Sequence, residues 1–116
     1  MGFMNIVFML HVAIDDYVLD VLLPDLTGHD RSPAAFLTYL VLWTQLYRTE
    51  QKSVAVSLER LAESTGLSRS AVQRAIRLLR RRNLIKVTKA SATAVPRYEL
   101  VRHWLRRRVK APSSTA

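Results

Sequence analysis

The stretch that decides the fold is LERLAESTGLSRSAVQRAIRLLRRRNLI, residues 58–85. Its apolar residues recur at three- and four-residue intervals on both sides of Gly66, which is the spacing of amphipathic helices. Gly66 can adopt a positive φ at little steric cost, so it marks a tight turn between the two helices. Ala62 is small, which lets the second helix cross the first closely. We therefore predict two short helices packed against each other across one turn.

The second of these helices has clear boundaries and a basic face. Ser68 precedes it as an N-cap, and Asn83 follows it where a left-handed residue is expected. With Val72, Ile76 and Leu79 turned inward, the outward face carries most of the charge. The segment 68–82 contains six arginines and no acidic residue. Such a face indicates nucleic-acid binding, and a merely solvated basic helix is the alternative.

This arrangement resembles the winged helix-turn-helix superfamily of small bacterial, phage and plasmid regulators. The likeness covers roughly residues 32–101 and rests on Leu61, Ala62, Gly66, Leu67, Val72 and the closing Asn83-Leu84-Ile85. Asn83 stands where many members carry glycine, and asparagine is the next-best residue for a left-handed turn. The resemblance implies an α+β, mainly α fold with three core helices, a two- or three-stranded wing sheet and an extra N-terminal segment. It also implies that the second helix enters the DNA major groove.

Composition and charge agree with a basic domain that binds a polyanion. The 116 residues are 49% hydrophobic, enough for one modest core. The net charge of +9 is unevenly distributed: residues 1–30 carry five aspartates and no Lys or Arg, and all 18 basic residues follow. We expect one face to meet nucleic acid and the acidic segment to lie away from it. The absence of cysteine excludes disulfides, a thiolate nucleophile and zinc-finger spacing.

Local signals divide the chain into three parts: an N-terminal segment 1–31 for dimerisation or core covering, a winged helix-turn-helix domain 32–101, and a basic, partly disordered tail 102–116. Ser32 and Pro33 start a helix that runs to about Arg48 and is apolar on more than one face. Residues 54–56 form a short strand. Residues 84–89 and 97–101 alternate as the two strands of a hairpin whose tip is 90–94, and Pro96 marks an edge strand.

The N-terminal segment leaves two interpretations open. Residues 1–14 either form a strand that is apolar on both faces and needs a second subunit, or are in part poorly ordered, since Met4 and Met9 are alternative starts. Next, Asp15 or Asp16 caps a short helix that Pro24 ends. Residues 25–30 follow as a connection. The apolar run is too short to span a bilayer and lacks a basic leader, so neither membrane insertion nor secretion is expected.

No pattern in the sequence indicates catalysis, a metal or a cofactor. The three histidines, His11, His29 and His103, occur singly without a second ligand at metal-binding spacing. The aspartates are expected to act as helix caps and as an acidic surface. Only three glycines are present, and they form no phosphate-binding loop. We predict a non-enzymatic protein with no second domain for a small-molecule effector.

The function that these features favour is sequence-specific binding of double-stranded DNA by a cytoplasmic, nucleoid-associated homodimer that regulates transcription. The predicted base-reading residues are Ser68, Arg69, Ser70, Gln73 and Arg74. The predicted backbone contacts are Arg77, Arg80, Arg81, Lys89 and Arg97. Residues before Pro33 are expected to make the dimer and to take no part in reading DNA. Two alternatives remain: a DNA-binding module of a plasmid or phage replication initiator or primosome protein, and a winged-helix adaptor for proteins.

Overall fold

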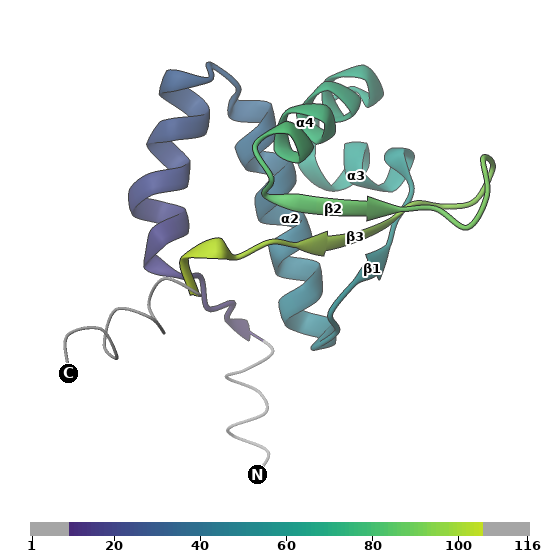
Figure 1. Cartoon of the computed structure of the whole chain (residues 1–116), viewed down its shortest axis with the longest axis horizontal. Coiled ribbons are helices and arrows are strands. Elements are labelled where there is room, and N and C mark those ends of the chain that lie inside the picture. The colour runs from purple at the N-terminus through teal and green to yellow at the C-terminus, as the bar shows by residue number, and fades with distance from the viewer. Residues whose placement is uncertain (1–9, 106–116) are drawn as a thin grey trace, which may run out of the picture.

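The computed structural model describes residues 10–105, which form helices packed on a small antiparallel sheet (Figure 1). The helix α2 (Pro33–Thr49) runs through the centre of the molecule. The helix-turn-helix pair α3 (Leu58–Thr65) and α4 (Arg69–Arg81) lies on one side of it, and a helical segment of residues 16–29 lies on the other. The predicted α+β, mainly helical fold is confirmed.

Short polar side chains start the three core helices, at Ser32 and Ser68 as the sequence predicted and likewise at Ser57. Ser32, Ser57 and Ser68 each accept, through Oγ, a hydrogen bond of 3.1 Å from the backbone N–H three residues later. Each bond satisfies a donor that the first turn of a helix leaves free. Pro33 occupies the first turn of α2, where the missing N–H costs nothing.

The ends of α3 and α4 also follow from single residues. Gly66 ends α3 with φ 80°, and its N–H donates to the Ala62 carbonyl. Asn83 follows α4 with φ 58°. The N–H groups of Asn83 and Leu84 donate to the carbonyls of Arg80 and Leu79, both at 2.9 Å, which is the hydrogen-bond pattern of a Schellman motif. The predicted left-handed turns at Gly66 and Asn83 are confirmed.

The sheet contains three antiparallel strands in the order β1-β3-β2. They are β1 (Val54–Ala55), β2 (Ile85–Thr88) and β3 (Arg97–Leu100). The predicted hairpin of β2 and β3 is present, with Val87 opposite Tyr98. The prediction of an edge strand at Pro96 is wrong, because β3 lies in the centre of the sheet. Pro96 precedes β3, and its carbonyl accepts the Val56 N–H, so its missing donor interrupts no ladder bond.

The N-terminal helical segment differs most from expectation. Pro24 does not end it: the chain stays helical through residue 29, with π-helical turns at η1 (Val18–Leu22) and η2 (Asp25–His29). Residues 25–30 are therefore mostly helix rather than connection. A proline removes one donor and crowds the carbonyl of the preceding turn, and wide turns accommodate both effects. Of the predicted N-terminal strand, residues 10–14 form no strand, and residues 1–9 lie outside the described part.

One hydrophobic core joins all these elements. Val18, Leu22 and Leu26 from the N-terminal segment are buried against α2, whose Tyr39 and Leu42 are fully covered. The core continues into α3, α4 and the sheet through Leu61, Val72, Ala75, Ile76, Leu79, Ile85 and Tyr98. The N-terminal segment thus covers apolar surface of its own chain, which explains why α2 is apolar on more than one face.

A cluster of polar and aromatic side chains joins the two ends of the described chain. The Asp15 carboxylate accepts hydrogen bonds from Arg102 Nη2 at 2.6 Å and from Trp104 Nε1 at 2.8 Å. The Trp104 ring is buried and stacks on Tyr17 with 4.5 Å between ring centroids. Trp43 Nε1 of α2 donates to the Ala13 carbonyl at 2.8 Å. The first residues of the predicted basic tail are thus packed into the fold, and residues 106–116 lie outside the described part.

Candidate nucleic-acid interface

The helix α4 presents an uninterrupted basic face to the outside. Successive residues of an α-helix turn by about 100°, so the buried Val72, Ile76 and Leu79 fix the opposite direction. That direction is occupied by one row of residues: Ser70, Arg74, Arg77 and Arg81. Every member of this row is exposed. The outward row therefore carries three positive charges and no negative one.

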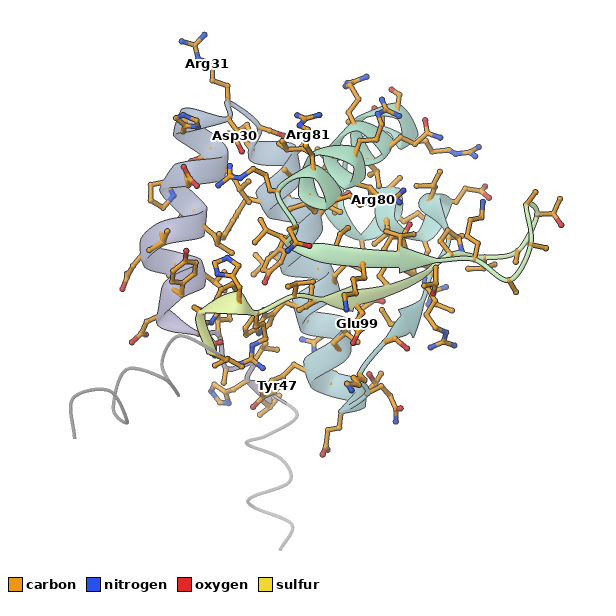
Figure 2. The ribbon with its side chains drawn as sticks, in the orientation of Figure 1. Asp30, Arg31, Tyr47, Arg80, Arg81 and Glu99 are labelled. Atoms are coloured by element: carbon orange, nitrogen blue, oxygen red, sulfur yellow. The ribbon has the colours of Figure 1, made fainter. Side chains whose placement is uncertain are left out.

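A second row lies beside the first, on the flank of α4 that faces the sheet. It consists of Arg69, Gln73 and Arg80, all of them exposed. Figure 2 shows Arg80 on the side of α4 towards β2 and Arg81 on the outer side. The charge of Arg80 also acts on Tyr98 of β3, whose pKa burial nevertheless raises. The second row therefore stands between the outward row and the hairpin.

The N-terminus of α4 and the turn before it are held by side-chain hydrogen bonds. Ser68 Oγ, which caps the helix, also lies 3.3 Å from Ser70 Oγ. In the preceding turn, Thr65 Oγ1 donates to the Leu61 carbonyl at 2.7 Å and accepts the Leu67 N–H at 3.2 Å. These bonds hold the end of α3, the turn after it and the first residues of α4. The predicted base-reading side chains consequently project from a well-defined frame, and Ser68 is part of that frame.

The hairpin contributes the remaining predicted contacts. Lys89 follows β2 and is exposed at the start of the loop 89–96, which projects from the body of the molecule (Figure 1). Arg97 at the start of β3 is exposed, and its Nη1 donates to Ser53 Oγ at 2.9 Å. All ten predicted site residues are thus exposed on α4, its N-cap or the hairpin. Their contact with DNA stays a prediction.

One arginine of the basic segment has a different role from the others. Arg82 turns away from the hairpin and bridges two carboxylates of the N-terminal segment: Nη1 donates to Asp30 Oδ2, and Nη2 donates to Asp25 Oδ2. These bonds raise the pKa of Arg82 above its usual value, the hydrogen bond to Asp25 contributing most. The guanidinium stays charged, but its charge is compensated by these carboxylates. Arg82 is therefore not counted in the basic face of α4. Its position at the end of α4 was visible in the sequence, but its two partners were not.

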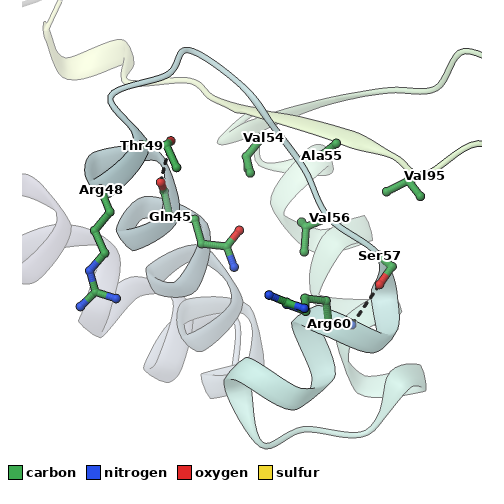
Figure 3. A pocket seen from close by; sticks show the side chains of 9 residues that line it. All are labelled: Gln45, Arg48, Thr49, Val54, Ala55, Val56, Ser57, Arg60 and Val95. Carbon is green, nitrogen blue, oxygen red and sulfur yellow. Dashed lines mark hydrogen bonds between the residues drawn. The ribbon is translucent and has the colours of Figure 1, made fainter.

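A hollow of about 520 Å³ opens elsewhere, between the second half of α2, β1 and the start of α3. Figure 3 shows Gln45 and Arg60 directed towards its centre and Arg48 directed away. Its lining contains no carboxylate, histidine or cysteine. Within residues 10–105, moreover, no cluster of three or more His, Cys, Asp or Glu side chains could hold a metal ion. The hollow thus gives no support to a catalytic or metal-binding assignment.

None of the helices within residues 10–105 combines the length and the apolar character that crossing a bilayer requires.

Comparison with known families agrees with this geometry. Residues 32–85 match the family model of a helix-turn-helix domain, which spans α2, β1, α3, α4 and the first residue of β2. No curated protein and no solved structure matched the chain. Residues 32–85 of this chain therefore match a helix-turn-helix domain, and the hairpin of β2 and β3 gives the fold the form of a winged helix-turn-helix.

Proposed function

We propose that this protein binds double-stranded DNA in a sequence-specific manner and acts in the cytoplasm, at the nucleoid, as a small transcriptional regulator. The observation that carries the proposal is the composition of the exposed face of α4. Arg69, Arg74, Arg77, Arg80 and Arg81 all lie on it. None of these five forms an ion pair within residues 10–105, so their charges are available to a polyanion.

We assign separate tasks to parts of this face. Arg69, Gln73 and Arg74, in the first half of α4, reach base edges when the helix enters the major groove, because Arg matches guanine and Gln matches adenine with two hydrogen bonds each. Ser68 and Ser70 lie at the N-terminal end of the same helix, next to these residues. The backbone contacts are assigned to Arg77, Arg80, Arg81, Lys89 and Arg97, which set orientation and affinity.

Selection of bound duplexes from a random pool tests the proposal directly. A defined motif is expected, and its place in promoters rather than at a replication origin would support a regulator over a replication initiator. Failure to bind any duplex at low salt would contradict DNA binding and favour the protein adaptor.

Replacing Arg69 with alanine tests base reading. We expect a loss of about 1–3 kcal/mol in binding free energy on the selected site and a much smaller loss on random DNA, because a base contact contributes only where the base is present. Fluorescence anisotropy at one fixed salt concentration measures both. Arg60→Ala on α3 is the matched control. An equal loss on both duplexes would show that Arg69 contacts only phosphate.

We further propose that the protein is a homodimer joined through its N-terminal segment. Leu19, Val21 and Leu23 of this segment remain 45%, 39% and 36% exposed, although their neighbours Val18 and Leu22 are buried. Apolar side chains exposed close together on one segment can form the kind of patch that marks a protein interface. A two-fold dimer would present two α4 helices to successive major grooves about 34 Å apart and would require an inverted-repeat site.

Sedimentation at micromolar concentration measures the oligomeric state. The unchanged chain is expected to sediment at about twice the monomer mass of 13.3 kDa. The double variant Leu19→Gln, Leu23→Gln is expected to sediment as a monomer and to bind a full site far more weakly than wild type. Val95→Gln, which alters an apolar residue 54% exposed in the hairpin loop, is the control and should remain dimeric. A monomeric unchanged chain would refute the dimer.

A further inference from the structure

Arg31 is a basic residue outside the helix-turn-helix domain whose place in the fold suggests a use. It connects the N-terminal helical segment to α2, is exposed, and has a left-handed backbone with φ 53°. It forms no ion pair with any residue in the described range 10–105. Figure 2 shows its side chain extending outward from the protein at the upper end of the molecule.

The residues next to Arg31 fix its position relative to α4. Asp30 accepts a hydrogen bond from Arg82, the residue that directly follows α4. Arg31 directly follows Asp30, and Arg81 directly precedes Arg82. The contact between Asp30 and Arg82 therefore brings Arg31 and Arg81 to the same part of the surface. Both are labelled at the upper side of the molecule in Figure 2.

The helix α4 lies between Arg31 and the hairpin. Arg69, Gln73 and Arg80 occupy the flank of α4 towards the sheet, whereas the 100° rotation per residue puts Arg82, with its partner Asp30, on the other flank. Figure 1 agrees: the N-terminal segment lies on one side of α4, and the hairpin extends on the other. A helix in the major groove has a phosphate backbone on each side of it, so the two flanks face different backbones.

We propose that Arg31 binds the phosphate backbone on the side of the major groove opposite to the hairpin. This contact rests on the proposed DNA binding and extends the interface beyond residues 32–101. It keeps the expectation that residues before Pro33 take no part in reading DNA, since Arg31 reads no base, and adds one phosphate contact from this segment.

The acidic residues near Arg31 do not oppose such a contact. Asp25 and Asp30 both bond to Arg82, and their side chains are 32% and 12% exposed. The adjacent His29 lies 3.0 Å from Asp30 through Nδ1. The negative charges are thus paired and largely covered, while the Arg31 guanidinium is open to solvent. Arg31, Arg81 and Arg82 together carry one charge more than Asp25 and Asp30, so this corner of the surface is not negative.

The salt dependence of binding tests this contact without knowledge of the operator, because phosphate contacts operate on any duplex. The affinity of the full chain for a 30-base-pair duplex of arbitrary sequence would be measured by anisotropy over a range of KCl concentrations. Arg31→Asn is the informative variant, because asparagine tolerates a left-handed backbone at little cost. We expect the slope of log K against log salt to become shallower by about 0.9 per chain, and the affinity to fall severalfold.

Three further variants make the result specific. Arg31→Lys should restore the slope, since lysine also binds phosphate. Arg31→Gly, which relieves the backbone and removes the charge, should reproduce the effect of Arg31→Asn. Arg48→Asn is the matched control, because Arg48 is exposed near the other end of the 17-residue helix α2, roughly 25 Å away at about 1.5 Å per residue. Its slope should equal that of the unchanged chain.

The outcomes separate the two levels of the proposal. An unchanged slope for Arg31→Asn, in a protein that binds duplex normally, would overturn the Arg31 contact and leave DNA binding intact. Absence of duplex binding by the unchanged chain would instead overturn the proposed function itself.

Discussion

Replacing Trp104 with alanine is expected to lower the free energy of unfolding by about 3–5 kcal/mol, the range for truncating a buried aromatic residue. Trp104 is only 4% exposed, and its ring stacks on Tyr17. The substitution also removes the hydrogen bond from Trp104 Nε1 to Asp15 Oδ2. Urea denaturation followed by circular dichroism measures the change.

Leu105→Ala is the matched control, since Leu105 adjoins Trp104 but is 37% exposed. It should change the stability by no more than about 0.5 kcal/mol, as surface substitutions usually do. A loss for Trp104→Ala no larger than that of the control would mean that the C-terminal segment contributes little to the fold in solution.

The helix-turn-helix was predictable because its signals are local. The caps at Ser32, Ser57 and Ser68 and the left-handed turns at Gly66 and Asn83 each depend on residues within one helical turn. The period of the apolar residues then fixed which side of α4 is buried. The same period left its arginines outside, so the exposed position of the candidate site residues followed from the sequence, although their binding to DNA remains a proposal.

The features that the sequence did not reveal depend on residues far apart in the chain. Arg82 meets Asp25 across 57 residues, and Trp104 meets Asp15 across 89. No local pattern distinguishes an arginine that faces solvent from one that meets two aspartates of a distant helix. The predicted end of the first helix at Pro24 was wrong for a related reason. The tendency of proline to end a helix was outweighed by the burial of Leu22 and Leu26 on either side of it.

The Arg82 bridge links folding to pH through Asp30. Burial alone would raise the pKa of Asp30, but the hydrogen bond from His29 and the charge and hydrogen bond of Arg82 outweigh burial and hold that pKa below its ordinary value of 3.8. A carboxyl whose pKa is lower in the folded state stabilises the fold above the unfolded-state value. That stabilisation is lost as the pH falls below 3.8 and through the folded-state pKa.

Replacing Arg82 with alanine is therefore expected to lower the free energy of unfolding at pH 7 by about 2–3 kcal/mol. Removal of one partner from a buried ion pair costs about 3–5 kcal/mol, and this site is partly open to solvent, so the expected loss is smaller. Two neighbouring carboxylates, Asp25 and Asp30, would be left without their shared cation. Arg82→Lys should recover only part of the loss, because an ammonium cannot replace a planar fork that donates to two carboxylates at once.

Denaturant titrations of the Arg82→Ala variant and the unchanged chain at pH 7 and near pH 3 would test both the size of this effect and its cause. The difference in stability should shrink at the lower pH, because protonated Asp30 no longer gains from the guanidinium. Arg81→Ala, which removes an exposed arginine beside the bridge, should change stability by less than about 0.5 kcal/mol at either pH. If the Arg82→Ala difference stayed constant with pH, the effect would have to come from lost packing of the arginine stem rather than from the ion pairs, and the N-terminal segment would not be held to α4 by charge.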